Sequence, residues 1–485
     1  MKQYQLFIDG KFVDNGNREM IQNINPSTEE VISEFPKATP EDVQAAVDAA
    51  FEAQKSWEKV PAVQRAAYVR EIAQGIRENA NFFAEIIMEE QGKSRGLATV
   101  EANFVPDYMD YMAEFARRIE GEVIESDAAN ENIFLYKEPI GVAAGILPWN
   151  FPFFLVARKM APALVAGNTI VIKPSSDTPN CAYEFAKIVE KSGLPHGVFN
   201  MITGSGAVVG DELSGNPKIG IVSMTGSVEV GAAIMATAAK NITKVSLELG
   251  GKAPTIVMAD ANLDKAAQAI FDSRIGNTGQ ICNNAERCYV QEDVVEEFTA
   301  KLLTLFKNTK YGPVFDDDSF DCGPLINAKQ RENVDAAVKK AVSQGANVLC
   351  GGEPDYEVGG GKGYFYKPTL LGGCTQDMDI MHEETFGPVL PICAFKTLDE
   401  AIDYANDCEY GLASSIFTNN MNYMMRACNE IKFGETYVNR WHFEAMQGFH
   451  QGVRKSGIGG ADGKHGFEEY LQTHVCYIDY DTEAN

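Results

Sequence analysis

The stretch GNTGQICNNAERCYV, residues 276–290, contains Cys282 and Cys288, two of the ten cysteines of the chain. A cysteine thiolate in a loop can act as a nucleophile, whereas a cysteine in a strand usually packs as a small apolar side chain. Cys282 lies among Gly, Asn and Thr residues, which are typical of a loop, and Cys288 stands at the head of an alternating strand pattern. The pattern therefore favours Cys282 as the reagent and Cys288 as a packing residue.

Two polar residues next to proline or glycine are further candidates for catalysis. Asn150 lies between two prolines in LPWNFP, a rigid turn that would present an amide donor to an oxyanion. Glu248 precedes two glycines in LELGGKAP, and a carboxylate at that point would serve as a general base. Taken singly, Asn150 also fits a plain turn residue, and Glu248 fits one half of a salt bridge.

A nucleotide site is suggested by MTGSVEVG, where Gly226 and Gly231 flank the expected start of a helix. The free N–H groups and positive end of a helix suit a pyrophosphate, and Ser227 would add a hydroxyl donor. The spacing is not GxGxxG, so a plain strand-to-helix turn is the alternative. Lys173, at the end of NTIVIKPS, is a candidate for ribose hydroxyls, or else a solvated lysine at a strand end.

These candidates must be positioned by the surrounding elements, and the strongest order lies between residues 140 and 251. Apolar runs alternate there with helical patterns, at VAAGILPW, NTIVIKPS, VFNMITG, IGIVSMTG and KVSLELGG. This alternation predicts an α/β fold, in which helices cover both faces of a parallel sheet and ligands bind beyond the carboxyl ends of its strands. Amphipathic helices are expected from about 40 to 118, and a second alternating series after 251 predicts a second α/β domain.

Composition limits the classes of function. A net charge of −26 disfavours nucleic acid or an anionic membrane surface as partner. No apolar run long enough to span a bilayer occurs, and MKQYQLFIDGKFVDNG lacks the apolar stretch of a secretory signal, so a cytoplasmic location is expected. The cysteines are scattered, and His382 has no second histidine four residues later, so we expect reduced thiols and no catalytic metal.

Four motifs carry a resemblance that spans nearly the whole chain. In order, they are PWNFP, LELGGK, GQICNNAER and EETFGPV. Together they resemble the NAD(P)-dependent aldehyde dehydrogenase superfamily. Further stretches, MHEETFGPVLP and HFEAMQGFHQGVRKSGIGGADGKHG among them, resemble the bacterial members that act on lactaldehyde or glycolaldehyde.

The resemblance implies a role for each catalytic candidate. Cys282 would attack the aldehyde carbonyl to form a thiohemiacetal, and Asn150 with the backbone N–H of Cys282 would hold the oxyanion. Glu248 would then activate the water that hydrolyses the thioester. Two hypotheses from other classes stay open: an inactive nucleotide-binding or structural relative, and a thiol hydrolase that acts on esters without a cofactor.

The resemblance also implies NAD or NADP as cofactor. Its contacts would be Leu147, Trp149, Lys173, Ser176, Gly226, Ser227, Glu384 and Phe386, with Glu384 on the nicotinamide ribose and Phe386 on the ring. Members that prefer NAD usually carry Glu three residues after the lysine, where this chain has Ser176 followed by Asp177. Loss of that carboxylate removes a repulsive charge, so we expect the choice to relax towards NADP, with Asp177 as a partial replacement.

Substrate contacts are expected on the helix after Asn150. Phe151, Phe154 and Arg158 share one face of that helix with Leu155, and the family places this face, together with His450, on the substrate tunnel. An arginine and a histidine suit a short aldehyde with a hydroxyl group, or alternatively an anionic semialdehyde such as succinate semialdehyde or sulfolactaldehyde. The Arg158 stem would otherwise pack while its head reaches water. Trp441 and His442 depart from the pattern of the most similar members and leave the substrate open.

The domain organisation implied by the resemblance has four parts. It consists of a Rossmann-like dinucleotide-binding domain of residues 1–120 and 141–251, a catalytic domain of 252–432, a return over 433–469 to the substrate tunnel and cofactor domain, and a β-extension of 121–140 and 470–485. The alternating stretches NIFLYKEPI and HVCYIDYD suit this extension, which would join subunits into a homo-oligomer, a tetramer or dimer.

Overall fold

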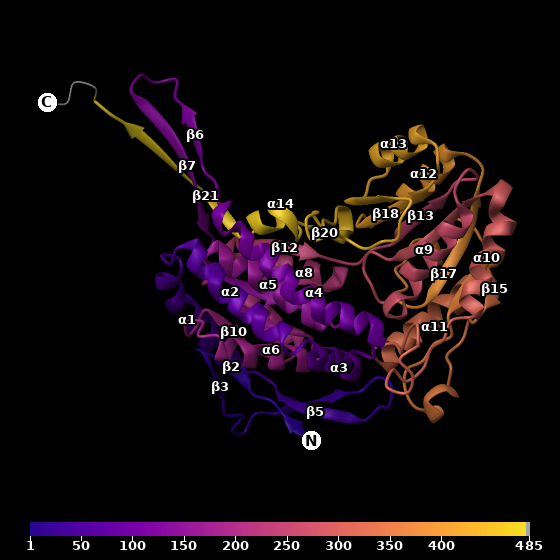
Figure 1. Ribbon diagram of the computed structural model, residues 1–485, viewed down its shortest axis with the longest axis horizontal. Helices are drawn as coiled ribbons and strands as arrows, with labels where there is room; N and C mark the ends of the chain where they lie inside the picture. Colours follow the sequence, from indigo (N-terminus) through magenta and orange to yellow (C-terminus); the bar gives the residue numbers. More distant parts are fainter. Residues whose placement is uncertain (482–485) are drawn as a thin grey trace.

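A mixed sheet with a parallel centre forms the middle of the first domain in the computed structural model, which describes residues 1–481 (Figure 1). Within these residues the sheet has eight strands, in the order β20-β12-β11-β8-β9-β10-β2-β3. They are β2 (Leu6–Ile8), β3 (Lys11–Val13), β8 (Val142–Ile146), β9 (Thr169–Lys173), β10 (Phe199–Met201), β11 (Ile219–Thr225), β12 (Lys244–Glu248) and β20 (Gly457–Ile458). The strands from β12 to β10 are parallel, as the alternating pattern predicts.

Helices cover both faces of this sheet, because its central strands are apolar on both sides. Ala143 of β8 packs into a core with α2–α6, whereas its neighbours Val142 and Ala144 pack into a second core with α1, α7 and α8. The helices are α1 (Pro40–Trp57), α2 (Ala62–Arg77), α3 (Ala80–Gln91), α4 (Arg95–Ala113), α5 (Pro152–Ala166), α6 (Asn180–Lys191), α7 (Asp211–Ser214), α8 (Val228–Ala238) and α14 (Gly463–Glu468). Successive side chains of a strand point to opposite faces, so one strand contributes to both cores.

The second domain repeats this arrangement and lies beside the first (Figure 1). Its sheet has the order β15-β16-β17-β14-β13-β18-β19. The strands are β13 (Ala253–Val257), β14 (Ala285–Gln291), β15 (Asn347–Cys350), β16 (Thr369–Cys374), β17 (Val389–Phe395), β18 (Ala413–Phe417) and β19 (Glu435–Val438), and the helices are α9 (Leu263–Ile275), α10 (Val295–Lys307), α11 (Ala328–Ser343), α12 (Leu398–Asn406) and α13 (Met421–Glu430). The predicted α/β fold class is therefore confirmed.

Two small sheets complete the described chain. One is formed by β1 (Lys2–Gln3), β4 (Met20–Ile24) and β5 (Val31–Pro36), and the other by β6 (Glu122–Glu125), β7 (Glu131–Pro139) and β21 (Leu471–Asp479). The second sheet projects away from both domains (Figure 1). Its strands fall in the segments expected to form the β-extension, of which residues 482–485 lie outside the described residues. The domain boundaries and the subunit contact remain predictions.

Candidate functional site

One cavity of about 520 Å³ lies where strands of the first sheet end and loops of the second domain approach them. Its lining includes the predicted residues Trp149, Asn150, Phe151, Phe154, Arg158, Gly226, Ser227, Cys282, Glu384 and Phe386, together with Trp441 and His442. The other predicted residues, Leu147, Lys173, Ser176, Glu248 and His450, are not part of this lining. The structure thus brings the proposed nucleophile, amide donor and phosphate-binding turn into a single space.

The loop that carries Cys282 has an unusual backbone. Between α9 and β14, the residues Asn277, Thr278 and Gly279 all have positive φ, at 50°, 56° and 74°. Such conformations are costly for residues with a β-carbon and are found most often at functional sites. Cys282 is partly exposed beyond this turn, whereas Cys288 is fully buried in β14 and burial raises its pKa far above that of a free thiol. The two cysteines therefore occupy the loop and strand positions that their sequence contexts predict.

Asn150 is held against this loop by several hydrogen bonds. Its side-chain Nδ2 donates to the carbonyl of Gln280 at 3.1 Å, and its own carbonyl accepts from Asn277 Nδ2 at 3.1 Å and from Lys93 Nζ at 2.8 Å. Lys93 is fully buried and pairs with Glu101 at 2.5 Å. The amide of Asn150 is thus held against the loop that carries Cys282, and its role as an oxyanion donor stays a prediction.

Lys93 and Glu101 are functional candidates that sequence reasoning missed. Besides its ion pair, the Glu101 carboxylate accepts from the backbone N–H groups of Phe153 and Phe154, both at 3.0 Å. The pair therefore supports the LPWNFP turn at two points, since Lys93 contacts Asn150 within the turn and Glu101 contacts the first turn of α5, which follows it. A lysine in the short loop between α3 and α4 and a glutamate within α4 carry no sequence signal for such a role, because most charged side chains face water.

Glu248 ends β12, and its side chain is buried between two cations. Its Oε1 lies 2.6 Å from Lys159 Nζ, and its Oε2 lies 3.4 Å from Arg158 Nη1. Burial alone would raise the pKa of Glu248. The opposite effect of Lys159 and Arg158 is larger, and the pKa falls to about 2. Glu248 is therefore ionised at neutral pH and forms the ion pair that its sequence left open as an alternative.

Arg158 does not reach solvent, so the alternative in which its head extends into water is excluded. Its side chain is 4% exposed, and the guanidinium binds Asp462 through two hydrogen bonds, with Nε to Oδ1 at 3.0 Å. Glu444 lies 3.9 Å from the same guanidinium. Sequence reasoning missed Asp462 and Glu444, although both stand in the stretch that carries part of the resemblance. The positive charge of Arg158 is thus already balanced by carboxylates of the protein.

His450 is buried next to the nucleophile. Its Nε2 lies 4.0 Å from Cys282 Sγ, and its Nδ1 lies 2.8 Å from the Glu435 carboxylate. Burial by itself lowers the pKa of His450, but Glu435 raises it and the net shift is strongly upward. An imidazolium supported by Glu435 therefore stands beside the thiol, and Glu435 is a partner that no motif indicated.

The predicted phosphate and ribose residues lie at the ends of β11 and β9. Ser227 is the N-cap of α8, where its hydroxyl accepts from the N–H of Val230 at 3.4 Å. Lys173 is 5% exposed, so a solvated lysine is excluded, and burial lowers its pKa to about 8. Ser176 donates to the carbonyl of Gly204 at 3.3 Å, and Asp177 accepts from Asn327 at 3.4 Å. A helix start with Ser227 at its cap fits a pyrophosphate, which such an end binds through its N–H groups.

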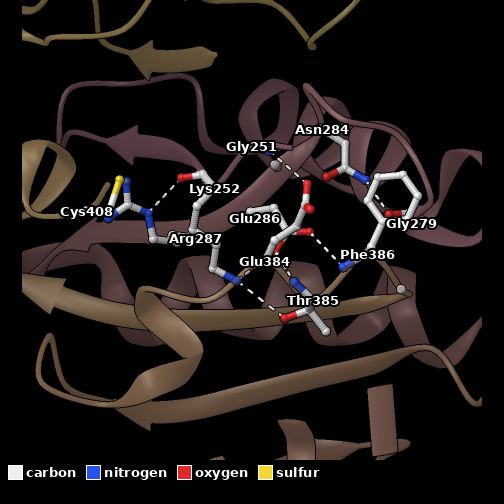
Figure 2. Close-up of polar contacts among 12 residues, drawn as sticks. Gly251, Lys252, Gly279, Asn284, Glu286, Arg287, Glu384, Thr385, Phe386 and Cys408 are labelled. Carbon is white, nitrogen blue, oxygen red and sulfur yellow. Dashed lines mark hydrogen bonds and ion pairs between the residues drawn. The ribbon is translucent and has the colours of Figure 1, made fainter. Parts of the chain in front are cut away.

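Glu384 and Phe386 approach the cavity from the second domain (Figure 2). Glu384 Oε1 accepts from the N–H of Gly251 at 2.8 Å, next to Gly250, where a β-carbon would lie 2.5 Å from the same carboxylate. Burial raises the pKa of Glu384 to about 8, with a further contribution from Glu286. The ring of Phe386 contacts Trp149 edge to face, with centroids 5.5 Å apart. These groups offer a carboxyl acceptor and an aromatic face for the ribose and ring of a nicotinamide.

Two further findings concern residues 1–481 as a whole. Within this described part, no helix combines the length and apolar character needed to cross a membrane. The same residues contain no group of three His, Cys, Asp or Glu side chains arranged to hold a metal ion.

Comparison with known proteins places these features in a family. The model of the aldehyde dehydrogenase family matches residues 12–476. Lactaldehyde dehydrogenase of Escherichia coli is 57% identical over 476 residues, 98% of each chain, and its crystal structure matches with a TM-score of 0.97 over 99% of both chains. The 3,6-anhydro-alpha-L-galactose dehydrogenase of a Vibrio species is 46% identical over 481 residues, which are 99% of this chain and 100% of that one. A solved 3,6-anhydro-L-galactose dehydrogenase in complex with NAP is 44% identical, with a TM-score of 0.96 over 98% of this chain and 100% of that one. The predicted superfamily is confirmed, and the chain belongs to the aldehyde dehydrogenase family.

Proposed function

We propose that this enzyme oxidises short 2-hydroxyaldehydes, such as lactaldehyde or glycolaldehyde, to carboxylic acids with NAD or NADP. The observation that carries the proposal is Arg158, which lines the cavity with Cys282 yet is already paired with Asp462 and Glu248. A compensated guanidinium suits a neutral hydroxyl group better than a free carboxylate. The relatives described above, named for lactaldehyde and 3,6-anhydro-galactose, support an aldehyde that carries hydroxyl groups.

The chemistry begins with Cys282, whose sulfur attacks the aldehyde carbon. The amide of Asn150 and the N–H of Cys282 stabilise the charge that develops on the oxygen, an effect of about 3 kcal/mol per donor in other enzymes. A nicotinamide dinucleotide held by Ser227, Glu384 and Phe386 would supply the hydride acceptor that converts the thiohemiacetal into a thioester. Water then attacks the thioester, and release of the acid restores Cys282.

Glu248 is the proposed base for this hydrolysis. While it is paired with Lys159 and Arg158, with a pKa of about 2, its carboxylate is a weak base. We therefore assign it to water activation only after it exchanges the Lys159 contact for a water molecule. During the attack by Cys282, the ion pair keeps the Glu248 carboxylate ionised and away from catalysis.

The charge balance around the tunnel argues against the anionic alternative. Arg158 and Lys159 contribute two positive charges, and Glu248, Asp462 and Glu444 contribute three negative charges within one connected set of ion pairs. The neighbouring pair of His450 and Glu435 adds one charge of each sign and leaves the excess unchanged. A further carboxylate or sulfonate would add to an excess of negative charge next to side chains that are almost fully buried, namely Arg158, Glu248 and Asp462.

A panel of short aldehydes tests this substrate class. We expect kcat/KM for glycolaldehyde and lactaldehyde to exceed that for succinate semialdehyde by at least about tenfold, which corresponds to about 1.4 kcal/mol of discrimination. NAD(P)H formation measured by absorbance gives each value. A preference for succinate semialdehyde or sulfolactaldehyde would refute the hydroxyaldehyde assignment, and no turnover with any of them would favour the inactive relative.

Cofactor choice is tested at Ser176, which is half-buried beside the proposed ribose site. Ser176→Glu places a carboxylate where it repels a 2′-phosphate, so we expect the kcat/KM ratio of NADP to NAD to fall by at least about tenfold. Ser176→Gln, which adds similar bulk without charge, is the control and should change the ratio less. Equal effects of the two substitutions would show that size, and not charge, governs this position.

The β-extension is our candidate for the subunit interface. β6, β7 and β21 form a narrow sheet whose exposed side chains include the apolar residues Val123, Ile124, Val475, Tyr477 and Ile478. Exposed apolar side chains on a sheet with open edges favour pairing with another chain. We propose a homo-oligomer, tetramer or dimer, that works in the cytoplasm, where its ten free cysteines stay reduced.

A further inference from the structure

The loop of Glu384 to Gly387 lacks regular secondary structure, so side chains from elsewhere must determine its shape. It lies between a short 3₁₀ turn at Asp379–Met381 and strand β17. Phe386 has a φ of 50°, a left-handed conformation that residues with a β-carbon rarely adopt. A loop that is strained in this way keeps its conformation only when its surroundings hold it.

Glu286, near the start of β14, supplies part of that support. Its Oε2 accepts from Lys252 Nζ at 2.7 Å and from the N–H of Thr385 at 3.2 Å. Its Oε1 accepts from Arg274 Nη1 at 2.6 Å and from the N–H of Phe386 at 3.3 Å. Each carboxylate oxygen thus serves one buried cation and one N–H group of the loop, and Figure 2 shows Glu286 between Lys252 and this loop.

The charge of Glu286 suits this role. Burial alone would raise the pKa of Glu286. The opposite effect of Arg274 and Lys252 is larger and lowers the pKa to about 2, so the carboxylate stays ionised. An ionised carboxylate only accepts hydrogen bonds, and both of its oxygens are therefore available to the loop. On the other side of the loop, Gln330 of α11 donates to the carbonyl of Phe386 at 2.9 Å.

The same segment of chain also carries the nucleophile. Glu286 follows Cys282 by four residues, and Gly279 precedes Cys282 by three. A β-carbon on Gly279 would lie 2.1 Å from the carbonyl oxygen of Gly387, so the two loops are in direct backbone contact. The catalytic loop and the loop of Glu384 and Phe386 are therefore joined at two points, one of them a buried charge.

We propose that Glu286 is a positioning residue for the dinucleotide. Glu286 accepts hydrogen bonds from the N–H groups of Thr385 and Phe386. It thereby fixes the position of the loop of Glu384 to Gly387 relative to Cys282. The nicotinamide end is thereby held close to the carbon that becomes bonded to sulfur. This inference rests on the cofactor contacts of the proposed function. Glu286 itself touches neither substrate nor cofactor in this arrangement.

Glu286→Gln tests the proposal, because an amide replaces one acceptor oxygen with a donor that an N–H group cannot use. We expect the Kd of NADH, titrated through protein fluorescence, to rise at least about tenfold. The KM for the aldehyde should stay within about threefold of the wild-type value. Hydrolysis of p-nitrophenyl acetate, which uses Cys282 and Glu248 but needs no dinucleotide, should also stay within about threefold.

A second variant keeps the test decisive if Glu286→Gln does not fold. Gln330→Leu removes the hydrogen bond to the Phe386 carbonyl without leaving a buried cation unpaired, and it should raise the same Kd by a smaller factor. Asp355→Asn is the matched control, since this buried carboxylate accepts from the N–H groups of Glu357 and Val358 away from the cavity. It should lower the Tm but leave the Kd of NADH within about twofold.

Two results would overturn the proposal. One is an unchanged Kd of NADH in both loop variants. The other is a loss of ester hydrolysis that parallels the loss of NADH affinity, because that pattern indicates a general effect on the fold. The proposed function fails separately, if the wild-type enzyme binds NADH but oxidises no short hydroxyaldehyde, and the comparison of Kd values remains valid in that case.

Discussion

Replacing Cys282 with alanine is expected to abolish aldehyde oxidation, with a loss of at least about 10⁴-fold in kcat. The substitution removes the only sulfur among the residues that line the described cavity, and nothing else there can form the thiohemiacetal. Steady-state NAD(P)H formation with glycolaldehyde measures the loss. Thermal unfolding of the variant should remain close to that of the wild type, because Cys282 is partly exposed in a loop.

Cys288→Ala provides the matched control within the same stretch of sequence. Cys288 is buried in β14 and its pKa is raised far above that of a free thiol, so it is unsuited to nucleophilic attack. We expect turnover within a few fold of the wild type, with a loss of stability of about 1 kcal/mol from the small cavity. Comparable losses of turnover in the two variants would contradict the assignment of Cys282.

Replacing Glu248 with glutamine is expected to slow hydrolysis of the thioester more than the steps before it. The loss of a general base costs about 10² to 10⁴-fold in the step that it serves. A rapid first turnover should therefore precede a slow steady state, and the first phase should approach one NAD(P)H per active site. Stopped-flow absorbance resolves the two phases.

The pairing of Glu248 with Lys159 adds a pH dependence to this prediction. Because the folded-state pKa of Glu248 is about 2, below the unfolded value of about 4.3, the ionised pair stabilises the fold above that unfolded value. This contribution is lost as the pH falls towards 2, and Glu248→Gln should lack it.

Equal loss in the first turnover and in the steady state would contradict the role of Glu248 in hydrolysis, provided the variant remains folded at neutral pH.

The sequence alone determined which residues could react and which elements carry them. Continuous apolar runs indicated buried parallel strands, and Asn150, Lys173 and Glu248 could be placed at or just beyond the ends of such strands. The distinction between Cys282 and Cys288 also followed from local pattern, since a loop rich in Gly and Asn and a strand with alternating burial differ within a few residues. These features depend on local conformational preferences and on side-chain periodicity, which are properties of short segments.

Only the tertiary structure decided which charges pair. Arg158, which lines the cavity as a predicted substrate contact, is paired with Asp462, which lies 304 residues away in the sequence. Glu286 and the N–H group of Thr385 are 99 residues apart, and Lys93 contacts the turn of Asn150 from the loop between α3 and α4. A buried charge is stable only when its partners are close, and strand order and helix packing bring such partners together from distant segments. The spacing of these residues along the chain does not indicate those contacts. The set of ion pairs around the site is therefore determined only when the two domains are folded against each other.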